Sequence, residues 1–311
     1  MVLGFSRKQF DAADIPDLTG KVAIVTGGNG GIGAETCLAL VRHNARVYMA
    51  ARSESKATKA IAEIKAKVPT ADLIWLKMDL MDLASVKAAA EEFTQRETRL
   101  DILINNAGVM AGPHEISKDG FETQFQTNHV GHYLFTRLLL PIIKSTAALP
   151  LTSVRIVNVS SLAHYFTRGT MTFETLEDVN QDFGSAWLRY GQSKLANLLF
   201  TKALQQRLDE KNIYVNAVHP GLINSGLWSS GNLISRVSSA FGSLTMISPY
   251  KGSLTQLYCA TSPEIEEKQY RGQFFKAICQ HATPTAQAQD QKLADNLWNL
   301  SEKVLQEKNL L

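Results

Sequence analysis

The sequence predicts a doubly wound α/β protein, with one parallel sheet of about seven strands and helices on both faces, in a single domain. Short runs rich in β-branched residues alternate with longer segments of helical periodicity, an order that builds right-handed βαβ units. A glycine-rich turn follows the first of these runs. Hydrophobic residues make up 45% and charged residues 20% of the 311 positions, so the chain can bury a large core.

The expected elements follow one another in a regular order from residue 21 onward. Strands are expected over residues 21–26, 46–51, 73–77, 100–105, 154–160, 214–219 and 273–275. Helices are expected over residues 31–43, 53–67, 83–98, 120–144, 187–208, 249–260 and 289–305. The strand segments, such as KVAIVT and LDILIN, are short apolar runs that are typical of strands buried on both faces. Ser53 is a candidate N-cap of the second helix, and Pro141 is expected to end the fourth, with fraying beyond it.

Two segments fall outside this alternation. Residues 1–20 are expected to form an N-terminal extension, ahead of a single domain over residues 21–311. Residues 222–247 are the least regular part of the domain and are rich in serine and large apolar residues. We expect them to form a substrate loop, followed later by a C-terminal helix.

Charge and cysteine content exclude several classes of function. The net charge is only +3, from 32 basic and 29 acidic residues with no basic run, which argues against a nucleic-acid partner. No uncharged apolar stretch reaches the roughly 18 residues of a transmembrane segment. Cys37, Cys259 and Cys279 are far apart and form no metal-ligand spacing, so we expect no metal, free thiols and a cytoplasmic location.

The turn after the first strand, TGGNGGIG at residues 26–33, has the composition of a phosphate-binding loop. Glycine lets the backbone approach a pyrophosphate closely, and the next helix offers free N–H groups and a positive dipole end. A tight turn without a ligand is the alternative. We interpret this as the dinucleotide site of a Rossmann-type fold, and its predicted cofactor-binding residues are Gly27, Asn29, Gly31, Ile32 and Gly33.

The end of the second strand indicates which nicotinamide cofactor binds. An NAD site needs a carboxylate here for the ribose 2′-hydroxyl, whereas this chain has Arg52, with Lys56 one turn further on. A guanidinium suits a 2′-phosphate, so NADP(H) is predicted to be preferred, with NAD(H) still possible. A solvated surface arginine is the alternative.

Tyr190 and Lys194 lie four residues apart in an expected helix, so their side chains share one face. An ionised Lys194 would favour the phenolate of Tyr190 and lower its pKa. The pair is therefore a candidate for general acid–base catalysis.

Several motifs together resemble the short-chain dehydrogenase/reductase family. They are the GxxxGxG spacing of the loop, NNAG at residues 105–108, the serine pair at 160–161, the YGQSK segment and the Pro-Gly pair at 220–221. The segments around them are most similar to retinol-dehydrogenase-like and WW-domain-oxidoreductase-like members.

This resemblance implies roles for further residues. Ser161, with Ser160 as a weaker candidate, would donate to the substrate carbonyl oxygen, and Asn128 would support a water-linked proton relay with Lys194. The catalytic set is then Asn128, Ser161, Tyr190 and Lys194. Further cofactor-binding residues implied by the family are Asp79, Leu80, Asn106, Ala107, Gly108, Tyr190, Lys194, Pro220, Gly221, Ile223 and Ser225.

The predicted function is NADPH-dependent reduction of a ketone or aldehyde, with Tyr190 as proton donor. Apolar residues in segments 162–189 and 222–247 indicate a medium-to-large hydrophobic substrate. Two alternatives stay open: an NAD(P)⁺-dependent alcohol dehydrogenase of the retinol or steroid kind, and a catalytically silent, cofactor-binding regulatory protein. The resemblance also implies a homodimer or homotetramer formed through the helices at 120–144 and 187–208.

Overall fold

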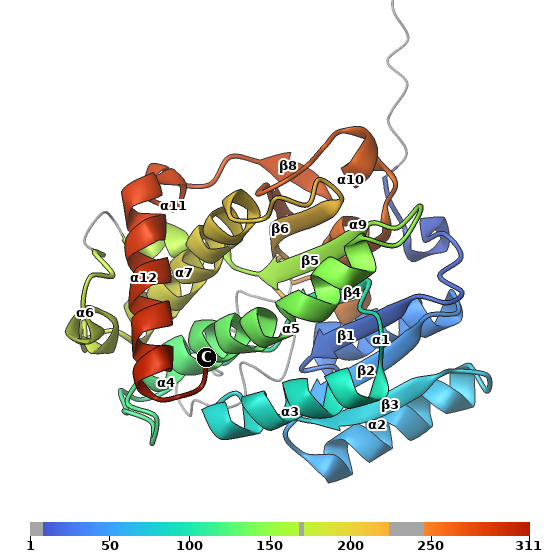
Figure 1. The fold of residues 1–311 in the computed structure, drawn as a ribbon, viewed down its shortest axis with the longest axis horizontal. Coiled ribbons are helices and arrows are strands. Elements are labelled where there is room, and N and C mark those ends of the chain that lie inside the picture. The colour runs from blue at the N-terminus through green and yellow to red at the C-terminus, as the bar shows by residue number, and fades with distance from the viewer. Residues whose placement is uncertain (1–8, 168–170, 224–245) are drawn as a thin grey trace, which may run out of the picture.

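A computed structural model describes residues 9–167, 171–223 and 246–311. Within them lies one sheet of eight strands in the order β3-β2-β1-β4-β5-β6-β7-β8 (Figure 1). Its strands are β1 (Val22–Thr26), β2 (Arg46–Ala51), β3 (Leu73–Lys77), β4 (Ile102–Asn105), β5 (Val154–Val159), β6 (Ile213–His219), β7 (Phe274–Lys276) and β8 (Gln280–Ala282). All neighbours pair in parallel except β7 and β8, which are antiparallel. The predicted fold class is therefore confirmed.

The helices connect these strands in the predicted alternation. The described helices of five or more residues are α1 (Gly31–Arg42), α2 (Glu54–Lys67), α3 (Leu83–Arg96), η2 (Gln126–Val130), α5 (Gly131–Ala147), η3 (Leu162–Thr167), α6 (Leu176–Asn180), α7 (Ala186–Gln206), α9 (Pro249–Thr261) and α12 (Gln291–Glu307). Shorter ones are η1 (Ala12–Asp14), α4 (Thr123–Phe125), α10 (Glu264–Glu267) and α11 (Ala286–Gln289). Among the described residues, no helix is both long and apolar enough to cross a membrane.

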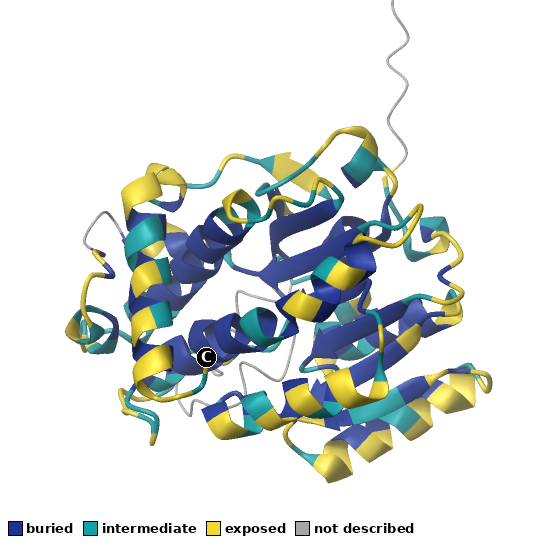
Figure 2. Ribbon diagram, viewed as in Figure 1, coloured by how far each residue is buried: buried dark blue, intermediate teal, exposed yellow. Residues whose placement is uncertain are grey.

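The sheet is buried between two helical layers. Helices α3, α5 and α7 cover one face, where Phe93, Tyr133 and Phe200 are fully buried, and α1 and α9 cover the other, around Leu40 and Leu257. Figure 2 shows the buried strands at the centre and the exposed residues on the outer faces of the helices. The chain order reverses between β1 and β4, so a crevice opens at the carboxyl ends of these two strands.

The helix expected over residues 120–144 differs from its prediction at both ends. It begins with α4 at Thr123 and a π-helical turn, η2, and then α5 continues through Pro141 to Ala147. Pro141 itself is exposed, whereas Ile142 and Ile143 beyond it are buried. The apolar face thus continues past the proline, and its burial outweighs the roughly 3 kcal/mol that an interior proline costs.

The C-terminal helix α12 packs across the outer faces of α5 and α7, as Figure 1 shows. The Trp298 ring lies 5.2 Å from that of Tyr133 and 6.2 Å from that of Phe200, and Arg137 pairs with Glu302 at 2.5 Å. This part of the α5–α7 pair is covered by the chain's own residues. The homo-oligomer expected through these two helices stays a prediction, and α12 restricts the surface it could use.

Candidate active site

The glycine loop between β1 and α1 has the geometry of an anion-binding turn. Gly27 and Gly31 have φ of +64° and +51°, a region that suits glycine. A Cβ on Gly33 would collide with the carbonyl oxygen of Gly27. Gly30, the N-cap of α1, provides no side-chain cap, and the first turn of α1 has no acidic residue. The N–H groups of this helix end are therefore available to a phosphate, so the loop fits the pyrophosphate of a dinucleotide.

A cavity of about 440 Å³ lies in front of this loop. The predicted cofactor residues that line it are Gly27, Asn29, Gly31, Ile32, Gly33, Arg52, Lys56, Asp79, Leu80, Asn106, Ala107 and Gly108. Arg52 is at its outer end, with its side chain 72% exposed and 4.0 Å from the carboxylate of Asp79. At that distance and exposure the ion pair is weak, so Arg52 can still turn toward an incoming phosphate.

Thr26 holds the carboxyl ends of β1 and β4 together. Its hydroxyl accepts from the amides of Asn106 and Ala107, each at 2.9 Å, and its carbonyl accepts from Asn106 Nδ2 at 2.8 Å. Asn106 thus has a structural role and also lines the cavity, as expected of a cofactor-binding residue.

A second cavity, of about 550 Å³ and mostly apolar, opens from the first. The two share Ile32, Asn106, Gly108 and Val109 as lining residues. The remaining predicted residues that line the second cavity are Ser161, Tyr190, Lys194, Pro220, Gly221 and Ile223. Ser225 lies outside the described residues, as does most of the expected substrate loop. The candidate catalytic side chains therefore lie beside the dinucleotide cleft.

Tyr190 and Lys194 project from α7 into the second cavity, as the four-residue spacing predicts. The Tyr190 hydroxyl is hydrogen-bonded with Ser161, and Lys194 Nζ lies 5.6 Å from the centre of the tyrosine ring. Lys194 Nζ also donates to the carbonyl of Val159, at 3.0 Å. A phenol and a serine hydroxyl thus meet at one point, where both can donate to a substrate oxygen.

The pKa values of this pair differ from the sequence-based expectation. Burial raises the pKa of Tyr190 to about 12, although its bond with Ser161 acts in the opposite direction, and burial lowers the pKa of Lys194 to about 7. The expectation that Lys194 lowers the pKa of Tyr190 is wrong for this structure. The reason is that removal from water disfavours the charged form of both groups.

Asn128 lies in η2, one of the wide turns that recur at functional sites. Its side-chain oxygen accepts from the amide of Val109 at 2.8 Å, and its nitrogen donates to Ser193 Oγ at 2.9 Å. A Cβ on Gly108 would lie 3.2 Å from Asn128 Oδ1 and 3.4 Å from Lys194 Nζ. Asn128 and Lys194 therefore face the same small space beside Gly108.

The two serines of the 160–161 pair have different environments. Ser160 is buried and donates to the main-chain carbonyl of Lys194 at 2.7 Å, which fastens α7 to the end of β5. Ser161 contacts Tyr190 instead. The geometry therefore supports the choice of Ser161 as the substrate-facing residue.

Sequence reasoning missed His219, which ends β6 and lines the apolar cavity. Burial lowers its pKa to about 4, and Nδ1 has no hydrogen-bond partner among the described residues. Its place just before Pro220, at the carboxyl end of a buried strand, was the available signal. A neutral imidazole here adds a polar edge to an otherwise apolar wall.

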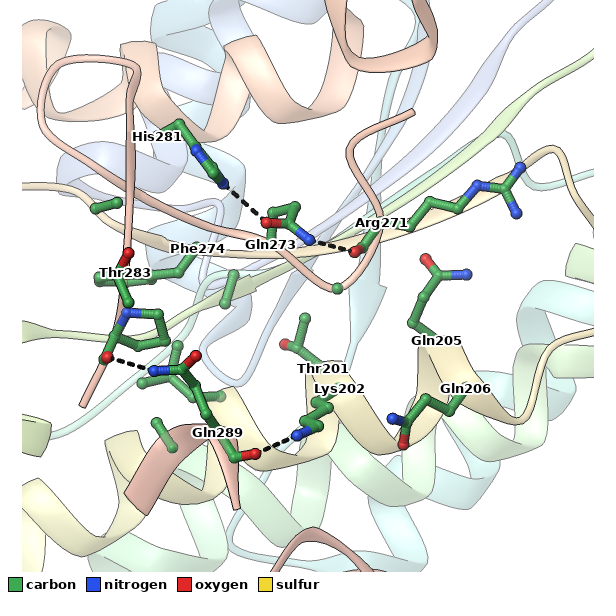
Figure 3. A pocket seen from close by; sticks show the side chains of 16 residues that line it. Thr201, Lys202, Gln205, Gln206, Arg271, Gln273, Phe274, His281, Thr283 and Gln289 are labelled. Carbon is green, nitrogen blue, oxygen red and sulfur yellow. Dashed lines mark hydrogen bonds between the residues drawn. The ribbon is translucent and has the colours of Figure 1, made fainter. Parts of the chain in front are cut away.

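A further cavity, of about 390 Å³, lies between α7 and the β7–β8 hairpin (Figure 3). Its polar groups largely bind one another: Lys202 donates to the carbonyl of Gln289, and His281 is 2.8 Å from Gln273 Oε1. None of the predicted site residues lines it. We therefore place the active site in the two joined cavities at the crevice.

A doubly wound sheet, an uncapped helix behind a glycine loop and a Ser-Tyr-Lys group beside the dinucleotide cleft define a nucleotide-dependent oxidoreductase. The sequence profile of short chain dehydrogenases matches residues 21–172. An uncharacterized oxidoreductase of Schizosaccharomyces pombe is 39% identical, over 98% of this chain and 90% of that protein.

Retinol dehydrogenase 12 of Mus musculus is 40% identical, over 93% of this chain and 87% of its own. A crystal structure of an uncharacterized protein from Mycobacterium paratuberculosis superposes with a TM-score of 0.72 at 33% identity, covering 96% of this chain and 98% of the other. The chain belongs to the short-chain dehydrogenase/reductase family, among its retinol-dehydrogenase-like members. It is thus an oxidoreductase that acts on CH–OH or C=O groups, as the motifs predicted.

Proposed function

We propose that this protein is an NADPH-dependent reductase of a ketone or aldehyde, acting on a medium-to-large hydrophobic substrate. The observation that carries the proposal is the meeting of Tyr190, Ser161 and Lys194 where the dinucleotide cleft joins the apolar cavity. A nicotinamide bound in the cleft supplies the hydride. The protein's own residues orient the carbonyl and manage its proton.

The protonation states favour reduction. A Tyr190 phenol with a pKa of about 12 is fully protonated at neutral pH and can donate to a carbonyl oxygen. Ser161 provides a second donor to that oxygen as it gains negative charge. Lys194, with a pKa of about 7, is partly protonated and can return a proton to the phenolate. Oxidation would instead begin by deprotonating a phenol that burial holds neutral.

The preference for NADPH rests on Arg52 and Lys56. Both line the outer end of the dinucleotide cleft, where the adenosine ribose of a cofactor would lie. Two cations at this point suit a 2′-phosphate, and the weak ion pair of Arg52 with Asp79 leaves the guanidinium able to bind it.

The substrate class follows from the rim of the apolar cavity. Leu162, Tyr165, Phe166 and Leu222 line it and are also exposed large hydrophobic residues. Exposed apolar side chains around one cavity mouth mark a surface that binds apolar ligands. An aromatic, polyketide-like or terpenoid carbonyl compound would suit it.

Oxidation of a hydrophobic alcohol is the second candidate, because a relative of 40% identity is named a retinol dehydrogenase. A panel of hydrophobic aldehydes and ketones with NADPH, and of the matching alcohols with NADP⁺, distinguishes the two by nicotinamide absorbance. We expect the larger kcat/KM for the carbonyl compounds at neutral pH. No turnover in either direction, with cofactor binding intact, would instead favour a catalytically silent regulatory protein.

A further inference from the structure

A buried network runs beneath the catalytic residues, and its centre is His132 in α5. The side chain is 2% exposed. Its Nε2 lies 2.8 Å from Thr26 Oγ1 at the end of β1, and its Nδ1 lies 3.0 Å from the main-chain carbonyl of Asn128. One imidazole therefore joins the strand before the glycine loop to the turn that carries Asn128.

The partners of Thr26 determine which nitrogen of His132 carries the proton. Thr26 Oγ1 accepts from the amides of Asn106 and Ala107, and these two bonds use both of its lone pairs. Its own proton must then be donated to Nε2. Nδ1 consequently carries the imidazole proton and donates it to the Asn128 carbonyl. Burial lowers the pKa of His132 to about 4, so this neutral form persists at neutral pH.

From Asn128 the network continues to the catalytic helix. Asn128 Nδ2 donates to Ser193 Oγ, which in turn donates to the main-chain carbonyl of Tyr190 at 2.8 Å. A path of hydrogen bonds thus leads from Thr26, next to the glycine loop, to the residue that carries the catalytic phenol.

The turn around Asn128 needs this support more than an ordinary helical turn does. Residues 126–130 form a π-helical turn, in which the regular hydrogen-bond ladder of an α-helix is interrupted. A side-chain bond to the Asn128 carbonyl therefore contributes a larger share of what fixes the turn. Without it, a buried carbonyl would lose its imidazole partner, which is costly.

We propose that His132 is a positioning residue: its Nδ1–H bond holds the Asn128 turn in the geometry that proton transfer at Tyr190 and Lys194 requires. His132 lines neither of the two joined cavities, so it acts through Asn128 and not on the substrate. The inference rests on the reductase proposed above.

Two substitutions of similar size separate the two bonds of the imidazole. His132→Asn keeps an N–H donor where Nδ1 stands, and His132→Gln keeps an acceptor for Thr26 near the place of Nε2. With saturating NADPH, we expect His132→Gln to lower kcat about tenfold, or roughly 1.4 kcal/mol, the scale of one buried hydrogen bond. His132→Asn should stay within about twofold of the parent, as the bond to Asn128 is retained.

The readouts distinguish positioning from general destabilisation. The dissociation constant of NADPH, measured by titration, should change less than about twofold in both variants, because only the proton-transfer geometry is altered. Equal kcat values for the Asn and Gln variants would overturn the proposal. So would nitrogen NMR of the isotope-labelled parent protein that found the imidazole proton on Nε2, a measurement that needs neither activity nor a variant. A parent protein without turnover would count against the reductase alone.

Discussion

The two joined cavities, the dinucleotide cleft and the substrate cavity, are lined by different kinds of residue. Five glycines line the dinucleotide cleft, and hydrogen bonds such as those of Thr26 with Asn106 and Ala107 fix its inner end. The walls of the substrate cavity are mostly apolar side chains, and Tyr165 and Phe166 at its rim are about half exposed. The dinucleotide cleft is therefore rigid and should tolerate few substitutions, whereas the side chains of the substrate cavity beside it can vary.

The largest loss of activity is expected where the dinucleotide cleft meets the substrate cavity. Tyr190→Phe removes the proton donor, so kcat should fall about a thousandfold, within the range for general acid catalysis. Tyr165→Phe at the cavity rim is the matched control and should retain its activity. Steady-state rates with NADPH measure both, and thermal melts check folding. Near-normal turnover of Tyr190→Phe would contradict the assigned role.

Acid should destabilise the protein through its buried histidines. Burial lowers the pKa of His129, His132 and His219 to about 3, 4 and 4 from the ordinary 6.5. Between pH 6.5 and pH 4 the unfolded chain binds more protons than the folded one, so the unfolding free energy falls as pH decreases. At pH 5 we expect a loss of about 2 kcal/mol for each histidine relative to pH 7. Urea unfolding at both pH values measures the loss, which His114→Gln, at an exposed histidine, should leave unchanged.

The rigidity of the dinucleotide half is tested by two glycines of one loop. A Cβ on Gly33 would collide with the Gly27 carbonyl, whereas a Cβ on Gly30 would meet no heavy atom within 4 Å. Gly33→Ala should therefore destabilise the fold by about 1–3 kcal/mol and weaken NADPH binding, as overpacking does. Gly30→Ala should leave the unfolding free energy nearly unchanged, because its Cβ meets no neighbouring atom of the protein. Chemical unfolding of both variants and cofactor titration of Gly33→Ala test the prediction. Equal unfolding free energies for the two variants would contradict it.

Cofactor choice should depend on the cations at the outer end of the dinucleotide cleft, Arg52 among them. Arg52→Ala is expected to raise the KM for NADPH about tenfold, the value of one charge-assisted hydrogen bond, and to leave the KM for NADH nearly unchanged. Arg96→Ala, another exposed arginine, serves as the control. An equal effect on both cofactors would show that Arg52 does not read the 2′-phosphate.

The smallest effect on the kinetic constants is expected at the rim of the substrate cavity. Phe166→Ala should raise the KM for a hydrophobic carbonyl substrate about fivefold with little change in kcat, because it removes apolar contact and no catalytic group. Leu151→Ala, at a fully exposed leucine that lines neither cavity, should leave both constants unchanged. A fall in kcat would mean that Phe166 also orients the reacting carbonyl.

Much of the fold could be predicted because its signals are local. Strand β5 was expected over residues 154–160 and ends at Val159, and the spacing of Tyr190 and Lys194 placed both in one cavity. The features that escaped prediction depend on distant parts of the chain. Strand β8 is three residues with no strong β-forming pattern, and it exists because β7 pairs with it. Helix α5 passes Pro141 because of the core beneath it.

The active site shows the same contrast between local sequence signals and contacts between distant residues. The glycine loop is encoded in eight consecutive positions, whereas the bond between Thr26 and His132 spans 106 positions. No local sequence pattern predicts such a contact. The pKa of Tyr190 was missed for the same reason, since burial is a property of the assembled cavity and not of the YxxxK spacing.

Helix α12 has a consequence for how the protein is made. The guanidinium groups of Arg137 in α5 and Arg207 after α7 lie over the Trp298 ring, 5.5 and 4.6 Å from its centre. Helix α7 is the helix that carries Tyr190. During synthesis this tryptophan is added after the whole of α7 and α9. Until it is in place, the outer side of the helix that carries the proton donor stays exposed to water, so the scaffold of the active site is complete only when a segment far downstream of it has been made.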